Sequence, residues 1–372
     1  MGVPLFASSL ERYHGALAER MAAVVRSGRY VLGPEVKGFE HELAEYLGVS
    51  HAIGVANGTD ALTIALRATG VQPGDHVVLP SFTFYATPES VVAAGAVPVF
   101  CDIDPATFCV TRQTVERAVT ERTRAIVPVH LFGNVAPVDD LRELGIPIVE
   151  DSAQAIGASV DGRRAGALGD AATFSFFPSK NLPCLGDGGA VVTNDDEIAA
   201  SARRLRFHGS DDKETFFDAG YNSRLDEVQA AVLRVLLPEL DAWNGARRRV
   251  AAAYEEGGLG DVVRLPQAVD GADPVYHLYV AQMDPRRFTC TRDEFVNALK
   301  AEGVPTAVHY PRPLTRQPAF ASFADAKVQK SVPVAESLCQ RVFALPMHHD
   351  LTDDHLRLIG EALTKVAAAY RA

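Results

Sequence analysis

The stretch "TFSFFPSKNLPCLGDGGAVV", residues 173–192, holds two short apolar runs with a lysine and a glycine-rich turn between them. The flanking runs, "ATFSFF" and "GAVVTN", have the length and composition of buried β-strands. Lys180 lies between them and has no charged neighbour from Ala171 to Leu185. This isolated cation has three interpretations: a solvated surface lysine, a phosphate binder or a covalent catalyst.

Similar short apolar runs precede this stretch. They are "HAIGVA" (51–56), "DHVVLP" (75–80), "VPVFCD" (97–102), "RAIVPVHL" (124–131) and "PIVED" (147–151). Helical patterns separate several of these runs, which predicts a mainly parallel sheet that helices cover on both faces. The predicted fold class is therefore α/β, with a large domain built on this central sheet.

Two amphipathic helices are predicted before the first strand. In residues 34–48 the apolar stripe ends at Gly48, a plausible C-cap. A longer helical stretch covers residues 224–256, where Pro238 must kink it, break it or begin a new helix. The predicted stripe of the first helix contains Leu10, Tyr13, Leu17, Met21, Val24 and Val25, and that of the second contains Val36, Phe39, Leu43 and Leu47.

We place a domain boundary near Gly245. The large domain then covers residues 1–245, including the N-terminal helices, and a small domain covers residues 246–372. In the small domain, "YHLYVAQM", "TRDEFVNALKAEG" and "TAVHYP" alternate strand-like and helical patterns. The sequence therefore predicts a second, smaller α/β unit at the C-terminal end.

Composition excludes several classes of function. The chain has 372 residues and a net charge of −11, whereas a nucleic-acid-binding protein needs a basic surface. Its apolar runs are too short to span a bilayer, and the N-terminus lacks a signal-peptide pattern. Five cysteines without paired spacing indicate reduced thiols, so we expect a cytoplasmic location.

The first candidate site is "VANGTDALTIAL", residues 55–66, in which a strand runs into a helix. In open α/β sheets, ligands bind at the carboxyl ends of the strands. Backbone N–H groups at the start of this helix, together with the Thr59 hydroxyl, could hold a phosphate. The alternative is that Thr59 is an ordinary N-cap.

The second candidate is "IPIVEDSAQAIG", residues 146–157, where Asp151 closes an apolar strand. A buried carboxylate needs a partner, and one suitable partner is a protonated ring nitrogen, which would keep Asp151 ionised. Gln154 lies one helical turn further on and could donate to a ring oxygen. The alternative is a helix-capping aspartate followed by an exposed glutamine.

The third candidate is Lys180 itself. The P-loop pattern GxxxxGK[ST] is absent around it. Its apolar flanks favour desolvation, which lowers the pKa of a lysine and makes its amine nucleophilic, as a Schiff base with an aldehyde cofactor requires. Ser175 and Ser179 are close enough in sequence to reach a phosphate, and "GDGGA" allows a tight turn near a bound ring.

The fourth candidate is "GYNSRLDEVQAA", residues 220–231, where Asn222 and Arg224 precede a long amphipathic helix. Its alternative is a simple N-cap, with Ser223 or Asp226 as the capping group. We expect no metal, because the adjacent histidines of "PMHHD" (346–350) do not match zinc-ligand spacing. His130 and His208 are interpreted as structural or cofactor-shell residues, and Cys184 as a packed residue.

Five of these motifs occur in one order and at one spacing: Thr59-Asp60, "EDSAQ", "SFFPSKN", "GDGGA" and "YNSRLDE". Together they resemble the DegT/StrS-type sugar aminotransferase family, enzymes of the aspartate-aminotransferase fold that use pyridoxal phosphate. The resemblance covers roughly Leu10 to Leu363. It implies that the cofactor alternates between pyridoxal and pyridoxamine phosphate while an amino group passes from a donor, L-glutamate, to a nucleotide-linked keto sugar.

The resemblance also implies a role for each matching residue. Lys180 binds the cofactor aldehyde and moves the proton, and Asp151 pairs with the pyridine nitrogen. Asn222 matches a residue at the phosphate of the partner subunit's cofactor, which implies a homodimer with shared active sites. The other matches are Gln154 at the ring hydroxyl, Gly58, Thr59, Asp60 and Ser175 at the phosphate, Phe84 stacked on the ring, and His309 and Tyr310 beside the sugar.

Residues flanking Lys180, "KNLPCLGDGGA", look like the branch that aminates carbon 3, so we expect a 3-keto acceptor; a 4-keto acceptor is the alternative. Arg224 could pair with a uronate carboxylate or meet a phosphate. Pro183 departs from the glycine usual in these relatives.

A dehydratase of the same family would carry histidine in place of Lys180. A non-catalytic regulator would not need the lysine, aspartate and glutamine, and a nicotinamide enzyme would need a G-x-G-x-x-G after the first strand.

Overall fold

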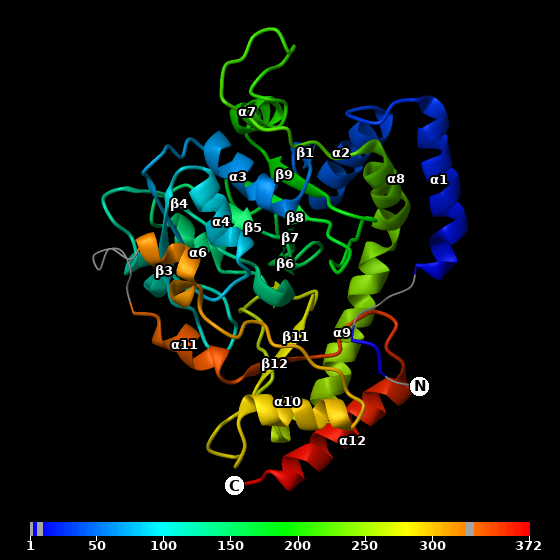
Figure 1. The fold of residues 1–372 in the computed structure, drawn as a ribbon, viewed down its shortest axis with the longest axis vertical. Coiled ribbons are helices and arrows are strands. Elements are labelled where there is room, and N and C mark those ends of the chain that lie inside the picture. The colour runs from blue at the N-terminus through cyan, green and yellow to red at the C-terminus, as the bar shows by residue number, and fades with distance from the viewer. Residues whose placement is uncertain (1–2, 6–9, 324–330) are drawn as a thin grey trace.

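The computed structural model describes residues 3–5, 10–323 and 331–372 (Figure 1). The α-helices are α1 (His14–Ser27), α2 (Pro34–Leu47), α3 (Gly58–Ala68), α4 (Ala86–Ala93), α5 (Arg112–Glu116), α6 (Val138–Arg142), α7 (Asp196–Arg206), α8 (Glu227–Leu236), α9 (Leu240–Glu256), α10 (Arg292–Ala301), α11 (Pro333–Cys339) and α12 (Asp353–Ala369). The strands are β1 (His51–Val55), β2 (His76–Pro80), β3 (Val97–Cys101), β4 (Thr123–Ile126), β5 (Val149–Asp151), β6 (Ser159–Val160), β7 (Arg163–Arg164), β8 (Ala171–Ser175), β9 (Gly189–Thr193), β10 (Ala272–Asp273), β11 (Tyr279–Gln282) and β12 (Val342–Leu345). Short 3-10 turns are η1 (Glu11–Tyr13), η2 (Leu131–Gly133), η3 (Leu237–Glu239), η4 (Leu259–Asp261), η5 (Leu314–Arg316) and η6 (Pro318–Phe323).

The central sheet has the predicted mainly parallel character. Its strands follow the orders β3-β2-β4 and β5-β8-β9-β1, and parallel bridges from Ile126 to Ile148 and from Val129 to Asp151 join the two sets. The pairs β2–β3, β2–β4 and β5–β8 are parallel, whereas β9 is antiparallel to both of its neighbours. The reversal at β9 arises because no crossover helix separates it from β8. The connection is instead the loop that carries Lys180.

Alternate residues of the strands pack into different cores, which is why these runs are apolar throughout. Ile53 and Val77 pack with α3, α4 and α7, while Ala52 and Val78 pack on the other face. That second face is covered by α5 and α6 over β2. Over β1 it is covered by α1, α2 and α8 (Figure 1). Burial on both faces is the condition under which a strand loses the polar-apolar alternation of a half-exposed sheet.

The N-terminal helices confirm most of the predicted pattern. Every predicted stripe residue of α2 is buried, and Gly48 ends the helix in the left-handed region with φ of 72°. In α1, Leu17 and Val24 are buried, but Val25 is 62% exposed, so its predicted place on the buried stripe is wrong. Neighbouring helical residues are rotated by about 100°, so Val24 and Val25 cannot both face α8.

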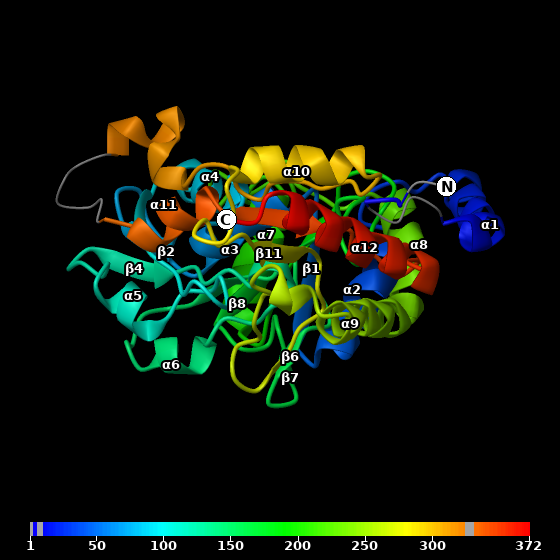
Figure 2. The ribbon, with the colours of Figure 1, turned by 90° about the horizontal axis from the view of Figure 1, so that it is seen from below.

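Pro238 breaks the long helical stretch into α8 and α9, with η3 between them. Gly245 lies within α9, and the division of the chain at residue 245 stays a prediction. Beyond α9, the antiparallel pair β11–β12 packs with α9, α10 and α12 around a core of its own. Figure 2, seen from below, shows these three helices around β11. No helix within the described ranges is long and apolar enough to cross a membrane.

One predicted strand is largely absent. The stretch "TAVHYP", residues 306–311, forms only an isolated antiparallel bridge, between Ala307 and Ala344. Pro305 precedes the stretch and Pro311 ends it, and neither has an N–H to donate to a ladder. The chain instead leads His309 and Tyr310 to the cavity described below.

Candidate active site

A cavity of about 740 Å³ lies where the loops after β1, β2, β5 and β8 meet two segments from the C-terminal part of the chain. This is the carboxyl edge of the parallel strands, the place where the sequence predicted a ligand. The structure brings ten of the predicted site residues to its walls: Gly58, Thr59, Asp60, Phe84, Asp151, Gln154, Ser175, Lys180, His309 and Tyr310.

The N-terminus of α3 forms one end of the cavity. Its N-cap is Asn57, whose side chain accepts a 2.8 Å hydrogen bond from the Asp60 N–H, so the alternative in which Thr59 is the cap is wrong. Asn57 takes that place because its backbone is extended, while Thr59 is already helical. Since the first N–H groups of a helix have no partner within it, those of Gly58 and Thr59 face the cavity end as anion donors.

Two glycines let the chain approach closely at this end. A Cβ on Gly58 would lie 2.7 Å from the Cβ of Ser175, and a Cβ on Gly189 would lie 2.4 Å from the carbonyl of Asn57. Both distances are below any real Cβ contact. The loop after β1 can therefore approach the end of β8 and the start of β9 only with glycine at these positions, and the Ser175 hydroxyl then lies beside the start of α3.

Asp151 ends β5 and is buried. Its Oδ2 accepts a 2.8 Å hydrogen bond from the Thr87 hydroxyl, and its Oδ1 accepts one of 3.2 Å from the Ala153 N–H. Burial raises the pKa of Asp151, while Thr87, Ala153 and Lys180 act in the opposite direction. Residues 152–158, which directly follow Asp151, form turns rather than a helix, so its alternative interpretation as a helix cap is wrong.

Gln154 is held in one orientation by the backbone. Its Oε1 accepts a 2.8 Å hydrogen bond from the Phe132 N–H, which leaves its amide nitrogen to donate, here to the Tyr310 hydroxyl at 3.3 Å. The side chain is only 8% exposed, so the alternative of a surface glutamine is wrong. It lies on a turn rather than one turn along a helix, because the segment after Ser152 is not helical.

Lys180 lines the cavity, and its backbone N–H donates a 2.8 Å hydrogen bond to the Phe177 carbonyl. Burial lowers the pKa of Lys180 to about 8, although the Asp151 carboxylate opposes the shift. An amine with this pKa is unprotonated in part near neutral pH and is then a nucleophile. A wholly solvated surface lysine would not undergo this shift.

Phe84 and Tyr310 form an aromatic wall. Their ring centroids are 6.4 Å apart, and Phe84 keeps 57% of its surface exposed although it borders the cavity. Tyr310 also packs on Phe132 and Phe82, with centroid distances of 6.2 and 5.8 Å. The buried rings fix Tyr310, while Phe84 leaves an open aromatic face for a flat ligand.

Asn222 and Arg224 are not brought to this cavity within the chain. Asn222 is exposed and forms an isolated antiparallel bridge with Phe207, so its role at a second subunit stays a prediction, and neither capping candidate makes a side-chain capping bond. Ser223 accepts a 3.1 Å hydrogen bond from the Ala56 N–H, and Asp226, although it is the N-cap residue of α8, makes no side-chain capping bond. This segment instead presents Asn222 on the outer surface.

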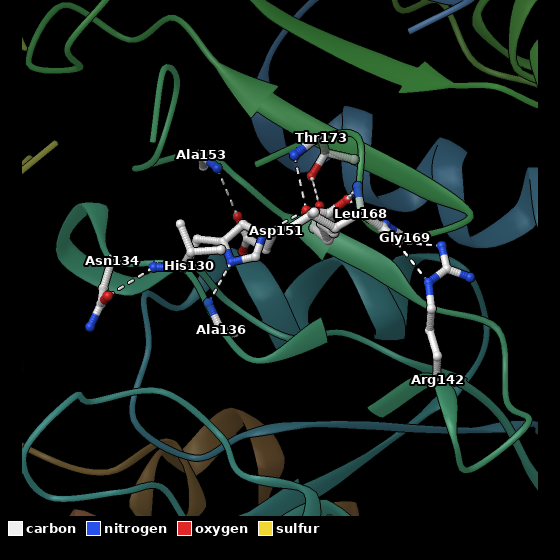
Figure 3. A network of polar contacts seen from close by, with 12 residues as sticks. His130, Asn134, Ala136, Arg142, Asp151, Ala153, Leu168, Gly169 and Thr173 are labelled. Carbon is white, nitrogen blue, oxygen red and sulfur yellow. Dashed lines mark hydrogen bonds and ion pairs between the residues drawn. The ribbon is translucent and has the colours of Figure 1, made fainter. Parts of the chain in front are cut away.

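A buried hydrogen-bonded pair that sequence reasoning missed, His130 and Glu150, adjoins Asp151, and Figure 3 shows His130 beside Asp151. Glu150 Oε2 is 2.7 Å from His130 Nε2, and the Glu150 carboxylate also accepts from the N–H groups of Gly166, Leu168 and Gly169. Because the Ala136 N–H donates to His130 Nδ1, the ring carries its hydrogen on Nε2 and donates it to Glu150. These donors lower the pKa of Glu150 against the effect of burial. A carboxylate inside an apolar strand was the available signal.

The cavity also contains Asp187 of the GDGGA motif, together with Thr87 and His277, to which sequence reasoning gave no role. His277 comes from a segment almost a hundred residues beyond Lys180, so only the tertiary fold brings the two together. The histidines of "PMHHD" lie elsewhere: His348 contacts the Pro4 carbonyl at 3.2 Å, and His349 stacks on Trp243 with centroids 4.8 Å apart.

Together the cavity groups fit one kind of cofactor. The α3 N-terminus offers donors to a phosphate, Asp151 a carboxylate to a cationic ring nitrogen, and Gln154 an amide N–H to a ring oxygen. Phe84 offers an aromatic face, and Lys180 an amine of lowered pKa to an aldehyde. This donor set fits pyridoxal phosphate, the cofactor predicted from the sequence.

Comparison with known proteins gives a family. Residues 13–364 match the DegT/DnrJ/EryC1/StrS aminotransferase family. The dTDP-3-amino-3,4,6-trideoxy-alpha-D-glucose transaminase of Streptomyces venezuelae is 47% identical, over 90% of this chain and 88% of that one. The UDP-2-acetamido-2-deoxy-3-oxo-D-glucuronate aminotransferase of Pseudomonas aeruginosa is 44% identical, over 92% and 93%. A protein of Geobacillus stearothermophilus named "Pleiotropic regulatory protein" is 45% identical, over 100% and 99%.

Solved structures agree with the sequence relatives. DesV of S. venezuelae in complex with a ketimine intermediate superposes with a TM-score of 0.92 at 44% identity, covering 98% of each chain. The structure of ntda from Bacillus subtilis, solved with bound cofactor pmp, has a TM-score of 0.89 at 28% identity, covering 99% of this chain and 85% of that one. The chain therefore belongs to the DegT/DnrJ/EryC1/StrS aminotransferase family and is an aminotransferase that uses pyridoxal phosphate.

Proposed function

We propose that this protein transfers the amino group of L-glutamate to carbon 3 of a nucleotide-linked keto sugar and so makes the 3-amino sugar. The observation that carries the proposal is the convergence of Lys180, Asp151 and the N-terminus of α3 on one cavity. A binding protein without catalysis has no need of an amine of lowered pKa on the cavity wall, so this observation also argues against a regulator that only binds the cofactor.

The geometry of the cavity supports a role for each residue that would hold the cofactor. The N–H groups of Gly58 and Thr59 bind the phosphate, together with the hydroxyls of Thr59 and Ser175. The N–H of Asp60 is already bonded to Asn57 and helps to fix this loop. In the rest of the cavity, Asp151 pairs with the ring nitrogen, Gln154 donates to the ring hydroxyl oxygen, and Phe84 covers one face of the ring.

Pyridoxal phosphate, when bound, supplies an electron sink that stabilises negative charge on the carbon bearing the amino group. The remaining work falls to the chain. Lys180 Nζ carries a proton to and from that carbon, because an amine with a pKa of about 8 can both accept and release one near neutral pH. Asp151 stays ionised, since an adjacent cationic ring nitrogen lowers its pKa.

Two observations support carbon 3 as the site of amination. The names of two relatives above 40% identity specify a 3-amino or a 3-oxo sugar. In addition, the loop of residues 180–190 has the composition expected for that branch. Selectivity for the ketone position has a geometric origin. The carbonyl carbon of the sugar must come within about 3–3.5 Å of the pyridoxamine nitrogen, and moving the ketone along the ring would rotate the sugar and break its other contacts. His309 and Tyr310 line the cavity, which supports them as residues that make such contacts.

We further propose that the active unit is a homodimer. Asn222 lies on the outer surface, away from the cavity of its own chain, which suits a residue that completes the site of a second copy. Nearby, Phe216 and Phe217 are 58% and 64% exposed, more than isolated surface phenylalanines need be. Arg224 would reach the acceptor sugar from the same segment.

The cellular location and the domain division are part of the proposal. All five cysteines are free in the structure, which suits the reducing cytoplasm. The core formed by β11, β12, α10 and α12 supports a small domain beginning near residue 246. The large domain would then hold the cofactor, and the small domain would contribute His277, His309 and Tyr310 to the cavity wall.

The proposed reaction can be tested in reverse. Enzyme in the pyridoxal form is mixed separately with 3-amino and 4-amino sugar nucleotides, and conversion to the pyridoxamine form is followed by absorbance. We expect conversion with a 3-amino substrate. Conversion with 4-amino substrates alone would contradict the assignment to carbon 3. A protein that binds the cofactor but converts neither class, and that glutamate does not convert either, would support the regulator instead.

A further inference from the structure

Asn181 and Asn244 form a buried amide pair beside the cavity. Asn181, the residue after Lys180, is 4% exposed, and Asn244 in α9 is 1% exposed. Neither residue lines the cavity, and none of the roles proposed above uses them. Burying an amide costs free energy unless its polar atoms are hydrogen-bonded, so the partners of this pair show what it holds together.

Backbone carbonyls fix the orientation of both amides. Asn244 Nδ2 donates to the Ile156 carbonyl at 3.0 Å, so Asn244 Oδ1 is the atom that accepts from Asn181 Nδ2, at 2.8 Å. Asn181 Nδ2 also donates to the Val275 carbonyl at 3.1 Å. A carbonyl oxygen can only accept, so neither amide can be turned over. Asn181 Oδ1 is left as an acceptor, and it contacts His277 Nδ1 at 3.3 Å.

These bonds join three segments of the cavity wall. Ile156 lies two residues after Gln154, which is on the wall. Asn181 directly follows Lys180, and His277 is itself on the wall. The three segments are far apart in the chain, and hydrogen bonds have narrow ranges of length and angle. The amide pair therefore sets where the Lys180 loop lies relative to the other two segments.

The surroundings of the pair are tightly packed. A Cβ on Gly157 would lie 2.5 Å from Asn244 Nδ2, closer than any real Cβ contact. About one helical turn after Asn244, Arg247 donates to the carbonyls of Tyr276 and His277 at 3.1 and 3.3 Å. Tyr276 has φ of 45°, in the left-handed region that non-glycine residues rarely adopt. Strained backbone of this kind persists where the surrounding structure fixes it, commonly at functional sites.

We propose that Asn181 is a positioning residue for Lys180: anchored by Asn244 and by the Val275 carbonyl, it fixes the lysine backbone so that the amine is held inside the cavity. On the other side, the Lys180 N–H donates to the Phe177 carbonyl at 2.8 Å. A long side chain loses much conformational entropy when it is placed, so a backbone fixed on both sides lowers the cost of reaching the cofactor. The inference rests on the proposed role of Lys180 as carrier of the cofactor.

Release of the lysine has a defined electrostatic effect. Burial lowers the pKa of Lys180 from 10.5 to about 8, and it outweighs the opposing effect of the Asp151 carboxylate. A lysine that is no longer held gains contact with water, so its pKa rises toward 10.5. The variants described below keep every other titratable group of the cavity wall: Asp60 of α3, Glu89 of α4, Asp151 of β5, Asp187 of the β8–β9 loop, and His277, His309 and Tyr310 of the C-terminal part.

The pH profile of covalent capture tests this role without turnover. The full-length chain, freed of cofactor, is mixed with pyridoxal phosphate over a range of pH, and capture is followed by visible absorbance. Only the unprotonated amine reacts with the aldehyde, releasing water, so the midpoint of the profile reports the pKa of Lys180.

Three variants are compared with the wild-type chain. Asn181→Ala removes the anchored side chain next to the lysine, and Asn244→Ala removes one of its anchors. Gln282→Ala is the matched control, because Gln282 is also a buried amide, 1% exposed, but it donates to the Pro105 carbonyl at 2.6 Å and is not part of the cavity wall.

We expect Asn181→Ala to raise the midpoint by about one pH unit, which slows capture roughly tenfold at neutral pH. Asn244→Ala should shift the midpoint in the same direction. The double variant should match Asn181→Ala alone, because Asn244 acts on the lysine through Asn181. Gln282→Ala should lower the thermal midpoint of unfolding and leave the pH profile unmoved, as should any change with a merely structural effect.

An unmoved or lowered midpoint in Asn181→Ala overturns the inference. Shifts that add in the double variant, or an equal shift in Gln282→Ala, also overturn it. Circular dichroism establishes that each variant is folded, and if Asn181→Ala does not fold, the shift in Asn244→Ala decides in the same way. If the wild-type chain does not capture the cofactor at Lys180, the proposed function itself fails, and the two failures remain distinguishable.

Discussion

The Thr87 hydroxyl lies 2.8 Å from Oδ2 of Asp151 and donates the shortest hydrogen bond that the structure gives to this carboxylate. Thr87 belongs to α4 and Asp151 to the end of β5, so the bond joins two walls of the cavity. Burial alone would hold Asp151 protonated to a higher pH, and the Thr87 hydroxyl opposes that effect. The ionised carboxylate needed beside a cationic ring nitrogen thus depends in part on a residue that no motif indicated.

Thr87→Val should move the acid limb of the activity profile upward by about one pH unit. The variant keeps the shape of the side chain but loses a donor to the charged carboxylate, so the pKa of Asp151 rises and the active ionised form is lost at a higher pH. The measurement is kcat/KM against pH. Thr83→Val is the matched control, because Thr83 contacts Thr87 at 3.3 Å but makes no hydrogen bond to Asp151. Identical acid limbs in the two variants would contradict this account of Asp151.

Gly58→Ala should weaken cofactor binding by tenfold or more, about 1.4 kcal/mol, while the protein stays folded. The added Cβ would lie 2.7 Å from the Cβ of Ser175 and force the start of α3 away from β8, so the phosphate donors would separate. Equilibrium titration of the cofactor-free chain with pyridoxal phosphate measures the change. Gly15→Ala in α1, where the added methyl meets nothing within 4 Å, is the control. Equal cofactor affinities in the two variants would contradict the assignment of the phosphate site to the N-terminus of α3.

Glu150→Gln should lower the free energy of unfolding by about 3 kcal/mol at neutral pH. Each carboxylate oxygen of Glu150 accepts hydrogen bonds from two donors. In Glu150→Gln the side-chain NH2 group replaces one of these oxygens in either orientation, and it cannot accept the two hydrogen bonds made there. Urea unfolding measures this loss. The surface variant Glu116→Gln is the control and should change the free energy of unfolding by less than about 0.5 kcal/mol.

The same variant has a defined pH dependence. The pKa of Glu150 is lowered in the folded chain, so its stabilisation is fully present above the ordinary value of 4.5. The stabilisation is lost only as the pH falls through the lower folded value. The difference between wild type and Glu150→Gln should therefore narrow on acidification below 4.5. A difference that widened toward acid would mean that Glu150 is protonated in the folded protein.

Mixing two inactive variants tests the shared active site. Lys180→Ala and Asn222→Ala subunits should regain activity after subunit exchange, because one site of each hybrid dimer then has both residues intact. Random pairing limits recovery to about a quarter of the wild-type rate, since half the dimers are hybrids with one good site of two. Native mass spectrometry establishes that hybrids form. Hybrids that form without any gain in activity would show that Asn222 does not act across subunits.

The sequence predicted the sheet and the positions of its loops because both depend on local patterns. The apolar runs from His51 to Thr193 became strands, and the loops at their carboxyl ends met in one cavity. Local patterns cannot decide between near-equivalent neighbours, which is why Asn57 rather than Thr59 caps α3. The same limit explains Val25, which shares the apolar character of Val24 but faces solvent.

Contacts between segments far apart in the chain could not be predicted from local sequence patterns. His277 shares a cavity with Lys180, and its backbone passes close to Gly133, an approach that no periodicity in the sequence predicts. His130 and Glu150 are twenty residues apart and pair because β4 and β5 run side by side. The stretch around His309 has the composition of a strand, but its flanking prolines and its place at the cavity override that preference.

Borohydride reduction tests the central claim that Lys180 carries the cofactor. The enzyme in its pyridoxal form is reduced, digested and analysed by mass spectrometry. We predict that the reduced cofactor is attached to the peptide containing Lys180 and to no other. Folded Lys180→Ala should show neither this adduct nor the visible absorbance of lysine-bound pyridoxal phosphate, and it should have no turnover. A reduced cofactor on another lysine such as Lys37, or full activity in Lys180→Ala, would contradict the account.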